Sequence, residues 1–466
     1  MPVRDSASDS PDSSVRLLTD RIDALPDSRA LWKFIALLAS GGFFGIYDLM
    51  QTGYISTGLM AEGIFHGGIS GKMLSSDQGT FAFITFTGLF IGAALLTPLA
   101  DKFGRRQTFL YALLWYSTCS LTMALQTQAH QVMFFRFLTG VGLGLEMVTI
   151  DSYLCEWVPR QLRSRAFAFS FFIQFLSVPA LALLSWWLIP QTIFGLAGWR
   201  WVVICGATGA LVIWFIRKKL PESPRWLMVQ GKHMEARKLI TAMETRCGLT
   251  ITPYAPAPVE DTLVLPRASF PLRERYRYRS RILLLVTMNI FQAVGFFGFG
   301  NWLPSLLAGK GTSLPHSLLY SFFITLAYPL TSLICSRFAG CIDNKWQIVL
   351  SSLLTIIAGT VFACADYLPA LILCGFLVTA SNAWLTCSYH AWQTELFPTA
   401  LRAGLSGLCY SFSRLSTALS SLIIGWLLSS SGPGAVLGFI IFCMVMVMTV
   451  TGIFGPETRG RSLEDI

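Results

Sequence analysis

The segment from Phe137 to Pro159 recurs in degraded form from Phe376 to Pro398, about 240 residues further along the chain. Each copy is apolar and ends in Glu-x-x-Pro-x-x-x-Arg, which reads Glu156, Pro159 and Arg163 in the first copy and Glu395, Pro398 and Arg402 in the second. Two further landmarks repeat at nearly the same spacing, namely Asp101 with Asp343 and Glu222 with Glu457. Landmarks that recur in the same order predict two homologous halves.

The composition is typical of a chain that crosses a membrane many times. Hydrophobic residues make up 53% of it and charged residues 13%, whereas soluble domains carry roughly 25% charge. Apolar segments of about 20 residues are long enough to cross ~30 Å of hydrocarbon. We predict such spans at 34–57, 80–100, 108–127, 131–155, 166–190, 198–216, 282–307, 317–337, 347–364, 368–390, 405–428 and 433–455. The predicted fold is an all-α membrane protein with twelve transmembrane helices in two pseudo-symmetric six-helix halves.

Basic residues gather in alternate loops and so indicate the orientation. Lys and Arg are concentrated before the first span, in 217–281, and after the even-numbered spans, while Lys72, Arg200 and Lys310 stand on the opposite side. The positive-inside rule then places both termini in the cytoplasm. The net charge of +10 is thus a topology signal and gives no reason to expect nucleic acid as a partner. We expect a monomeric integral protein of a bacterial inner membrane.

The spans also divide the chain into regions. The first thirty residues are rich in Ser, Asp and Arg, which is typical of a disordered segment. The predicted regions are a disordered cytoplasmic tail at 1–30, a first six-helix half at 31–216, a cytoplasmic linker at 217–281, a second half at 282–456 and a cytoplasmic tail at 457–466.

Cysteine and histidine show no ligand pattern. The eleven cysteines include no Cys-x-x-Cys pair, and the five histidines are dispersed. The sequence contains no Gly-x-x-x-x-Gly-Lys-Ser/Thr segment for ATP. We therefore expect no metal site, no cofactor and no enzymatic activity.

Five charged residues stand out inside predicted spans, where a charge is costly unless it has a partner, a wet cavity or a function. They are Asp48, Arg136, Glu146, Asp151 and Arg414. At about 100° per residue, Asp151 shares a helix face with Gly140 and Gly144, small residues typical of close packing. Glu146 points away from these glycines and is the better candidate for a cavity residue. Arg414 cannot lose its charge, so it needs an anionic substrate, an acid of the other half or helix-end carbonyls.

Motifs at the ends of the predicted spans carry a resemblance to a known family. They are Asp101-Lys-Phe-Gly-Arg-Arg106, Arg136 with Gly140-x-Gly-x-Gly144, Glu156-x-x-Pro159-x-x-x-Arg163, Pro221-Glu-Ser-Pro-Arg225, Glu395-x-x-Pro398-x-x-x-Arg402 and Pro456-Glu-Thr-Arg-Gly460. With these motifs the chain resembles a major facilitator superfamily transporter, in particular the sugar-porter and metabolite:proton symporter branches. The resemblance implies two halves that rock against each other around a small-molecule site.

The resemblance also implies a proton-coupling site. In similar proton-coupled members, an Asp of the first helix and an Arg of the fourth form the coupling pair, and Asp48 and Arg136 match those positions. A guanidinium stabilises a nearby ionised carboxylate, so moving Arg136 would change the proton affinity of Asp48. A purely structural ion pair is the alternative. Glu146 is expected to be a second protonation site or a substrate contact, and the proton is the expected coupling ion.

The pore of this family is lined chiefly by helices one, four, seven and ten. Polar and aromatic side chains on one stripe of the seventh and tenth spans are therefore candidate substrate contacts, although such a stripe can also serve helix packing. With residues of the first and eleventh spans added, the candidates are Gln51, Asn289, Gln292, Phe296, Asn382, Thr386, His390 and Arg414.

Acid–arginine pairs at the inner ends of helices join the two halves in this family and hold the outward-facing state. The alternative is that these charges only solvate helix ends. The expected latch residues are Asp101, Arg105, Arg106, Glu156, Arg163, Glu222, Arg225, Asp343, Glu395, Arg402, Glu457 and Arg459.

These expectations favour proton-coupled uptake of a small organic metabolite. Because Arg414 lacks an evident partner, an organic anion such as a carboxylate is favoured over a neutral sugar. A sugar or polyol porter and a proton-driven exporter of organic ions stay open, as do facilitated diffusion and antiport.

Overall fold

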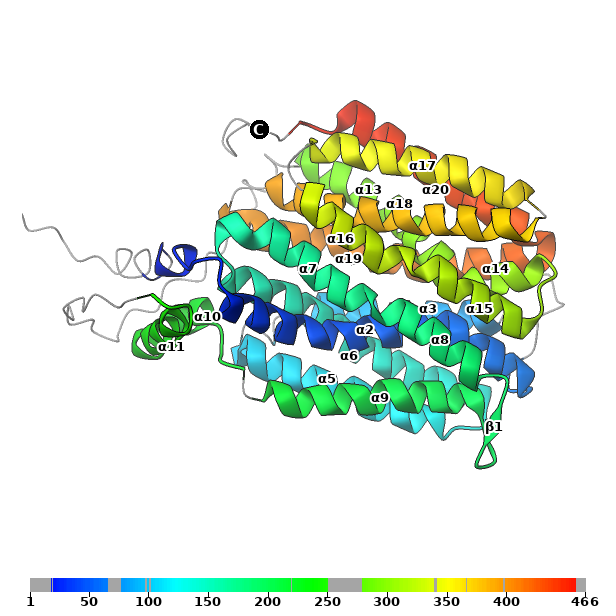
Figure 1. Ribbon diagram of the computed structural model, residues 1–466, viewed down its shortest axis with the longest axis horizontal. Coiled ribbons are helices and arrows are strands. Elements are labelled where there is room, and N and C mark those ends of the chain that lie inside the picture. The colour runs from blue at the N-terminus through cyan, green and yellow to red at the C-terminus, as the bar shows by residue number, and fades with distance from the viewer. Residues whose placement is uncertain are drawn as a thin grey trace, which may run out of the picture.

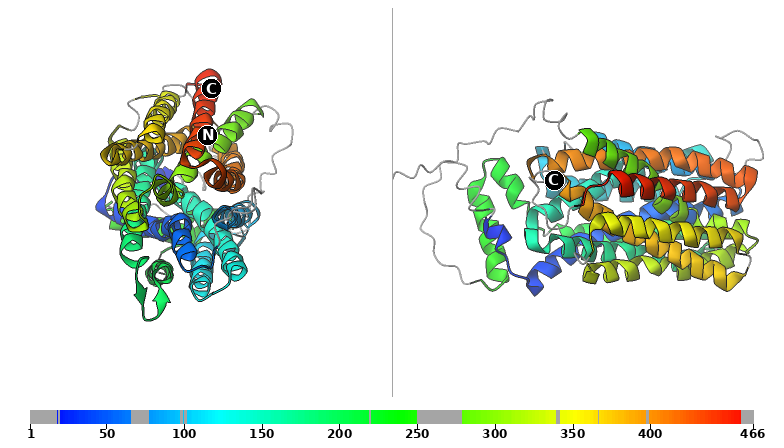
Figure 2. Two further views of the ribbon diagram at one scale, coloured as in Figure 1. Left: turned by 90° about the vertical axis from the view of Figure 1, so that its right-hand side faces the viewer. Right: turned by 90° about the horizontal axis from the view of Figure 1, so that it is seen from above.

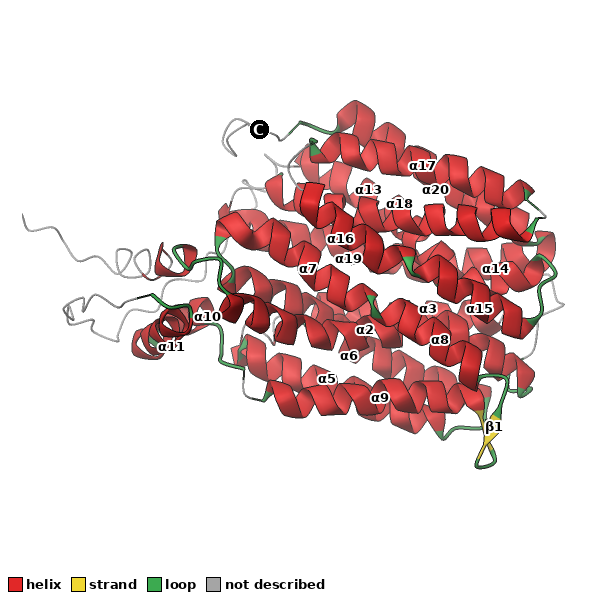
Figure 3. Ribbon diagram, viewed as in Figure 1, coloured by secondary structure: helices red, strands yellow, loops and turns green. Residues whose placement is uncertain are grey.

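A computed structural model describes residues 18, 20–65, 77–96, 99, 102–218, 220–249, 279–338, 342–365, 367–396 and 399–457, with the backbone alone at 160, 164, 336, 394, 395 and 399–407. The described chain is almost entirely helical (Figure 3). Its long helices run roughly parallel in one elongated bundle (Figure 1). Seen end-on, the blue-to-green helices and the yellow-to-red helices occupy opposite sides of that bundle (Figure 2).

In the described part of the first half, seven helical segments lie in the bundle. They are α2 (Arg29–Ala61), α3 (Asp77–Leu95), α5 (Arg105–Ala124), α6 (Ala129–Trp157), α7 (Arg163–Phe175), α8 (Ser177–Leu188) and α9 (Gly198–Arg217). A 3₁₀ turn at Arg160–Leu162 precedes α7, and a short hairpin of β1 (Thr192–Ile193) and β2 (Leu196–Ala197) joins α8 to α9. Two short helices follow, α10 (Pro224–Val229) and α11 (His233–Arg246).

The second half repeats this arrangement. Its helices are α13 (Arg279–Gly300), α14 (Leu303–Gly309), α15 (Leu314–Thr325), α16 (Ala327–Phe338), α17 (Asn344–Cys364), α18 (Leu368–Glu395), α19 (Thr399–Ser431) and α20 (Pro433–Phe454). In the text below, the inner end is the end of the bundle that carries α10 and α11 (Figure 1), and the charge bias predicts it to be cytoplasmic. The outer end carries β1 and β2.

Within the described residues, eleven spans are long and apolar enough to cross a membrane, with α7–α8 and α15–α16 each forming one span. The remaining long helix, α5, has 20 residues, as α9 has. Its Ser, Thr, Gln and Tyr side chains lower its hydropathy, and it packs between α6 and α9. These observations confirm the predicted all-α fold with twelve transmembrane helices.

Prolines interrupt two of the spans. Pro179 and Pro329 each lie three residues after a break, at Leu176 between α7 and α8 and at Leu326 between α15 and α16. Proline lacks the backbone N–H and clashes with the carbonyl four residues earlier, which explains both breaks. The halves meet along these helices, since α7 contacts α16, α8 contacts α15 and α3 contacts α19.

Glycines bring α3 and α6 together, as predicted for Gly140 and Gly144. A Cβ on Gly140 would lie 2.4 Å from the carbonyl oxygen of Thr85, and one on Gly144 would lie 2.1 Å from that of Leu89. No larger residue fits at either position without separating the helices. This close contact sets the position of α6, and therefore of its residue Arg136, along the axis of α3.

The described part of the predicted disordered tail is structured, which corrects the prediction for residues 18 and 20–30. Leu18, Ile22 and Leu25 are buried in a hydrophobic cluster with residues of α10 and α11. Their spacing of four and three residues makes one apolar helical face, which the polar composition of the segment had obscured. Arg21 reinforces the contact: its Nε and Nη2 donate to the Glu244 carboxylate at 2.9 and 2.5 Å.

Candidate functional site

A buried ion pair joins α2 to α6 inside the first half. Arg136 Nη1 donates to Asp48 Oδ1 at 2.5 Å, and Nη2 donates at 2.5 Å to both the Asp48 carbonyl and Thr52 Oγ1. Arg136 Nε donates to Thr85 Oγ1 at 3.2 Å, and Ser120 Oγ donates to Asp48 Oδ2 at 2.6 Å. The two side chains are 0% and 3% exposed. The predicted pair is therefore formed, and both Asp48 and Arg136 have further hydrogen-bond partners.

Glu146 lies deeper toward the inner end of the same half. Its side chain is fully buried on α6, and its Oε2 would lie 3.0 Å from a Cβ on Gly45 of α2. Among the described residues, the Tyr116 hydroxyl of α5 is within hydrogen-bonding reach of its carboxylate. The structure thus places Glu146 beside the first helix, as expected of a residue that faces the interior of the half.

In the second half, the predicted contacts on α13 and α18 hydrogen-bond to one another. Asn289 Nδ2 donates to Gln393 Oε1 at 3.3 Å, and the Tyr389 hydroxyl donates to the side-chain oxygens of both residues. Gln292 Nε2 donates to Thr386 Oγ1 at 3.4 Å. These contacts hold α13 against α18, so the packing alternative describes Asn289 better than a freely available substrate contact.

Three other predicted substrate contacts, Gln51, Asn382 and Phe296, are buried inside the bundle. Both amide atoms of Gln51 and the Oδ1 of Asn382 are buried without a hydrogen-bond partner among the described residues. Phe296 packs its ring 5.9 Å from that of Phe175 and 5.5 Å from that of Tyr328. Phe175 and Tyr328 flank the two proline breaks, so this aromatic cluster lies where the halves meet.

Arg414 of α19 faces the first half. Its Nη2 donates to the Tyr410 hydroxyl and lies 3.8 Å from Met147 Sδ of α6. The guanidinium carbon lies 5.2 Å from the centre of the Phe297 ring. The side chain is almost completely buried, and Nη1 has no hydrogen-bond partner in the described part of the chain. A buried guanidinium nitrogen of this kind is suited to bind an anion.

Asp151 and His390 complete this cluster. The charge of Asp151, on α6, acts on Arg414 across the boundary between the halves. The His390 ring lies 5.2 Å from the Tyr410 ring and 5.1 Å from that of Phe171 on α7. Of the partners left open for Arg414, an acid of the other half lies near enough to influence it electrostatically.

Four of the described latch residues form two pairs at the inner end. Arg105 Nε lies 3.1 Å from Glu156 Oε1, and the Arg106 backbone N–H donates to Glu222 Oε1 at 3.0 Å. Burial raises the pKa of Glu222, and hydrogen bonds from backbone N–H groups partly offset this rise. These contacts tie α5, α6 and the segment before α10 together at the inner end. They do not themselves join the two halves.

The other latch candidates have separate surroundings. Arg163 Nε donates to the Val158 carbonyl at 3.3 Å, Arg225 lies 3.7 Å from Asp23, and Glu457 accepts from Trp346 Nε1 at 3.2 Å. Asp343 caps α17 by accepting from the Lys345 N–H at 2.9 Å. Asp101 and Arg459 lie outside the described residues, as do the side chains of Glu395 and Arg402.

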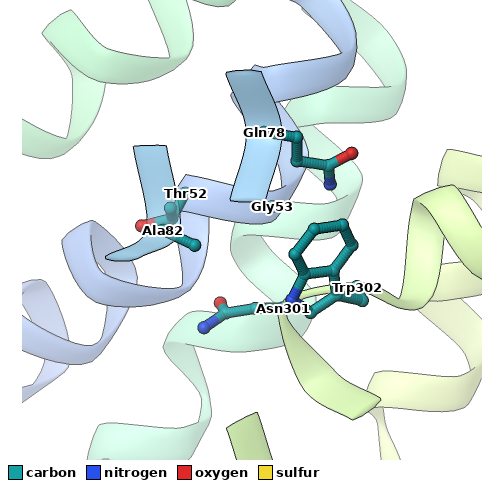
Figure 4. A pocket seen from close by; sticks show the side chains of 6 residues that line it. All are labelled: Thr52, Gly53, Gln78, Ala82, Asn301 and Trp302. Atoms are coloured by element: carbon teal, nitrogen blue, oxygen red, sulfur yellow. The ribbon is translucent and has the colours of Figure 1, made fainter. Parts of the chain in front are cut away.

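At the outer end the halves touch. A Cβ on Gly53 of α2 would lie 1.5 Å from the Asn301 carbonyl oxygen, and Gln78 Nε2 donates to Ser305 Oγ at 2.8 Å. A small hollow lies between these contacts, lined by Thr52, Gly53, Gln78, Ala82, Asn301 and Trp302 (Figure 4). It leaves essentially no room for a water-sized molecule, whereas small-molecule sites usually measure 300–1,000 Å³. The hollow is therefore part of a closed outer contact and is too small to be a substrate site.

Comparisons with known proteins now identify the family. A family model described as "Sugar (and other) transporter" matches residues 34–466. The chain belongs to this family. The putative metabolite transport protein YyaJ of Bacillus subtilis (strain 168) is 30% identical over 447 residues, which cover 95% of this chain and 96% of that protein. The niacin transporter NiaP of Acinetobacter baylyi is 26% identical over 468 residues, covering 96% and 99% of the two chains.

Solved structures show the same fold. The xylose transporter XylE from E. coli, in a partially occluded inward open conformation, matches with a TM-score of 0.73 and 18% identity over 93% of this chain and 100% of that one. XylE bound to 6-bromo-6-deoxy-D-glucose, described as a major facilitator superfamily proton:xylose symporter, matches with a TM-score of 0.69. The family model and the relatives identify the protein as a transporter and not an enzyme, and the solved structures show that it has the major facilitator fold.

Sequence reasoning missed one charged residue of this transporter. Arg217 was assigned to the linker, but it is the last residue of α9 and is fully buried. A signal for it was present in the first span, where Gly41 and Gly45 are one helical turn apart and leave space on one face.

In the described residues, no three His, Cys, Asp or Glu side chains come together as metal ligands do.

Proposed function

We propose that this transporter takes up a small organic anion together with protons by alternating access. The observation that carries the proposal is the Asp48–Arg136 pair, in which an acid that can bind a proton is held by a cation that cannot release one. Protonation of Asp48 removes one charge and weakens the pair, so α2 and α6 can shift relative to each other. Proton binding then favours one conformation over the other.

The substrate site in this proposal is the cluster around Arg414. A substrate carboxylate can accept from Arg414 Nη1 and replace Asp151 as its counter-charge. Because Asp151 and Arg414 belong to different halves, this replacement changes the attraction between the halves as the substrate binds. Substrate binding is thereby linked to the rocking movement.

The rings near Arg414 favour a planar substrate. Phe297, Tyr410, His390 and Phe171 lie within one connected set of ring contacts around the guanidinium. Aromatic faces stack on aromatic ligands and exclude water from the charged group. The similarity to a niacin transporter supports the same chemistry, because niacin is an aromatic ring that bears a carboxylate. We therefore propose an aromatic monocarboxylate as the preferred substrate.

One set of observations favours a sugar or polyol instead. The amide atoms of Gln51 and Asn382 are buried without partners in the described chain and could bind hydroxyl groups. The fold is also that of a xylose transporter. Transport of an uncharged polyol is therefore the second candidate function. Export of organic ions, with net transport in the opposite direction, is the third.

A thermal-shift experiment on the purified transporter separates these candidates. Nicotinate, nicotinamide and xylose are compared at equal concentrations. A ligand that binds the folded state at 100 times its Kd stabilises that state by about 2.7 kcal/mol. The proposal expects a rise in melting temperature with nicotinate or a related aromatic carboxylate and none with the amide. A rise with xylose alone would replace the anion assignment by the polyol one.

A further inference from the structure

One face of α2 makes room for charged side chains from two other helices. Gly41, Gly45 and Asp48 share this face, because four and three residues correspond to about one helical turn. A Cβ on Gly41 would lie 1.9 Å from Arg217 Nη1, and one on Gly45 would lie 3.0 Å from Glu146 Oε2. The two side chains therefore occupy the volume that larger residues at 41 and 45 would fill. From the inner end outward, the order along α2 is Arg217, Glu146, Asp48.

Glu146 and Arg217 differ from the fully bonded pair next to them. Both are 0% exposed and their charges interact. Arg217 Nε donates to the Leu37 carbonyl at 2.9 Å, and the guanidinium carbon lies 4.1 Å from the centre of the Phe109 ring. Nevertheless Arg217 Nη1 and Arg217 Nη2 have no hydrogen-bond partner within the described chain, and Glu146 has the Tyr116 hydroxyl alone within hydrogen-bonding reach there. A purely structural pair buried this deeply would satisfy those atoms.

Tyr116 of α5 provides the connection between this pair and Asp48. Its hydroxyl is buried, lies within hydrogen-bonding reach of the Glu146 side chain, and interacts electrostatically with Asp48 and Arg217. The groups that face Glu146 are therefore Arg217 from α9, Tyr116 from α5 and Asp48 from α2. All of them can hold or stabilise a charge, and they lead from the coupling acid toward the inner end.

We propose that Glu146, held by Arg217, relays the proton between Asp48 and the inner end of the transporter. The O–H bond of the Asp48 carboxyl breaks and an O–H bond forms on the Glu146 carboxylate. Tyr116 can accept the transferred proton while donating its own, so it ends unchanged. Glu146 then releases the proton to water at the inner end, and the charge of Arg217 stabilises the carboxylate left behind. This inference rests on the proposed proton coupling through Asp48.

Infrared spectroscopy of the purified protein tests the relay without any substrate. Spectra recorded between about pH 5 and pH 9 should contain the C=O band of a protonated carboxyl that is absent from Glu146→Gln. The C=O band of the protonated Asp48 carboxyl is identified by its absence from Asp48→Asn. After a jump from low to high pH, the decay rate of this band should be lower in Glu146→Gln than in wild type by a factor of about ten or more. Wild-type decay in Glu146→Gln would show that the proton leaves Asp48 by another route.

Variants of Arg217 examine its role separately. Arg217→Gln removes the stabilising charge, so the Glu146 band should persist to a pH higher by about one unit or more, while Arg217→Lys should stay near wild type. Arg200→Gln is the matched control, because Arg200 is also buried on α9 but is bonded to Glu62 and to the Ala124 carbonyl at the outer end. It should not move the Glu146 band. A band that is the same in Arg217→Gln and wild type would exclude Arg217 from the relay.

The relay and the coupling can fail independently. If Glu146→Gln spectra equal those of wild type at every pH, Glu146 does not change protonation and the relay is wrong, whatever uptake shows for Asp48. If Glu146 and Asp48 behave as expected in the spectra but uptake ignores the proton gradient, the coupling is wrong and the two acids only exchange protons.

Discussion

Asp48 on α2 and Arg136 on α6 are joined at 2.5 Å in a site where the two side chains are 3% and 0% exposed. The second oxygen of Asp48 accepts from Ser120, and Arg136 also donates to Thr52 and Thr85. Each charge is therefore balanced by a partner on another helix. Loss of the charge on Asp48 would leave Arg136 buried without its counter-ion, which is why protonation there can alter helix positions.

Asp48→Asn should abolish accumulation of substrate against its gradient. Asparagine has nearly the same shape as aspartate but cannot bind and release a proton at this site. Exchange of substrate across the membrane should persist, because exchange needs no net proton movement. The measurement is uptake of the ligand identified by thermal shift, in vesicles with and without a proton gradient. Continued accumulation by Asp48→Asn, with wild type insensitive to a protonophore, would contradict coupling at this residue.

Arg414→Lys should weaken binding of an anionic substrate by about tenfold or more, or at least ~1.4 kcal/mol. Lysine keeps the charge but loses the planar fork that binds a carboxylate through two hydrogen bonds. Arg414→Gln should weaken binding further. Affinity is measured by titration calorimetry with the carboxylate, and the corresponding amide serves as the uncharged control. If both variants lose only thermal stability and retain affinity, Arg414 is a structural partner of Asp151 and does not bind substrate.

Cysteines at Gln78 and Ser305 should form a reversible crosslink that stops transport. These side chains hydrogen-bond to each other between α3 and α14 at 2.8 Å, so the outer contact must open for alternating access. Oxidised Gln78→Cys/Ser305→Cys protein in a background without other cysteines should be inactive, and reduction should restore uptake. Each single variant is its own control. Full activity of the oxidised double variant would mean that this contact does not open during transport.

Arg21→Ala should lower the stability of the inner helices α10 and α11. The lost contact is a two-point pair with Glu244 that is partly shielded from solvent, and removing it should cost about 1–2 kcal/mol. The measurement is the melting temperature together with the rate of limited proteolysis in α11. Arg246→Ala is a suitable control because Arg246 is exposed on the same helix. Equal effects of the two substitutions would show that the Arg21 contact does not stabilise the segment.

The orientation can be checked by labelling single cysteines in intact cells. Phe194 at the tip of the β1–β2 hairpin is 90% exposed, and Lys232 before α11 is exposed at the opposite end. A membrane-impermeant thiol reagent should label Phe194→Cys and leave Lys232→Cys unmodified until the cells are opened. Labelling of Lys232→Cys alone would reverse the predicted topology.

The sequence repeat and the apolar spans were enough to predict the twelve helices and the two halves, because hydrophobic length and charge bias are local properties of the chain. The Asp48–Arg136 pair was also expected, because the family resemblance pairs an Asp of the first helix with an Arg of the fourth and both charges lie in apolar spans where a charge needs a partner. The segment at 20–30 was misjudged because composition was weighed above the spacing of Leu18, Ile22 and Leu25.

Other relationships depended on the tertiary structure. The sequence left the partner of Arg414 open, and it gives no indication that Asp151 lies near enough to influence Arg414, that Tyr389 donates to Asn289, or that the charge of Arg217 acts on Glu146. Each of these contacts joins helices that are far apart in the chain. Their partners are set by how each helix is rotated and how deeply it packs, and those are determined by the close contacts of the whole bundle and not by any local pattern of residues.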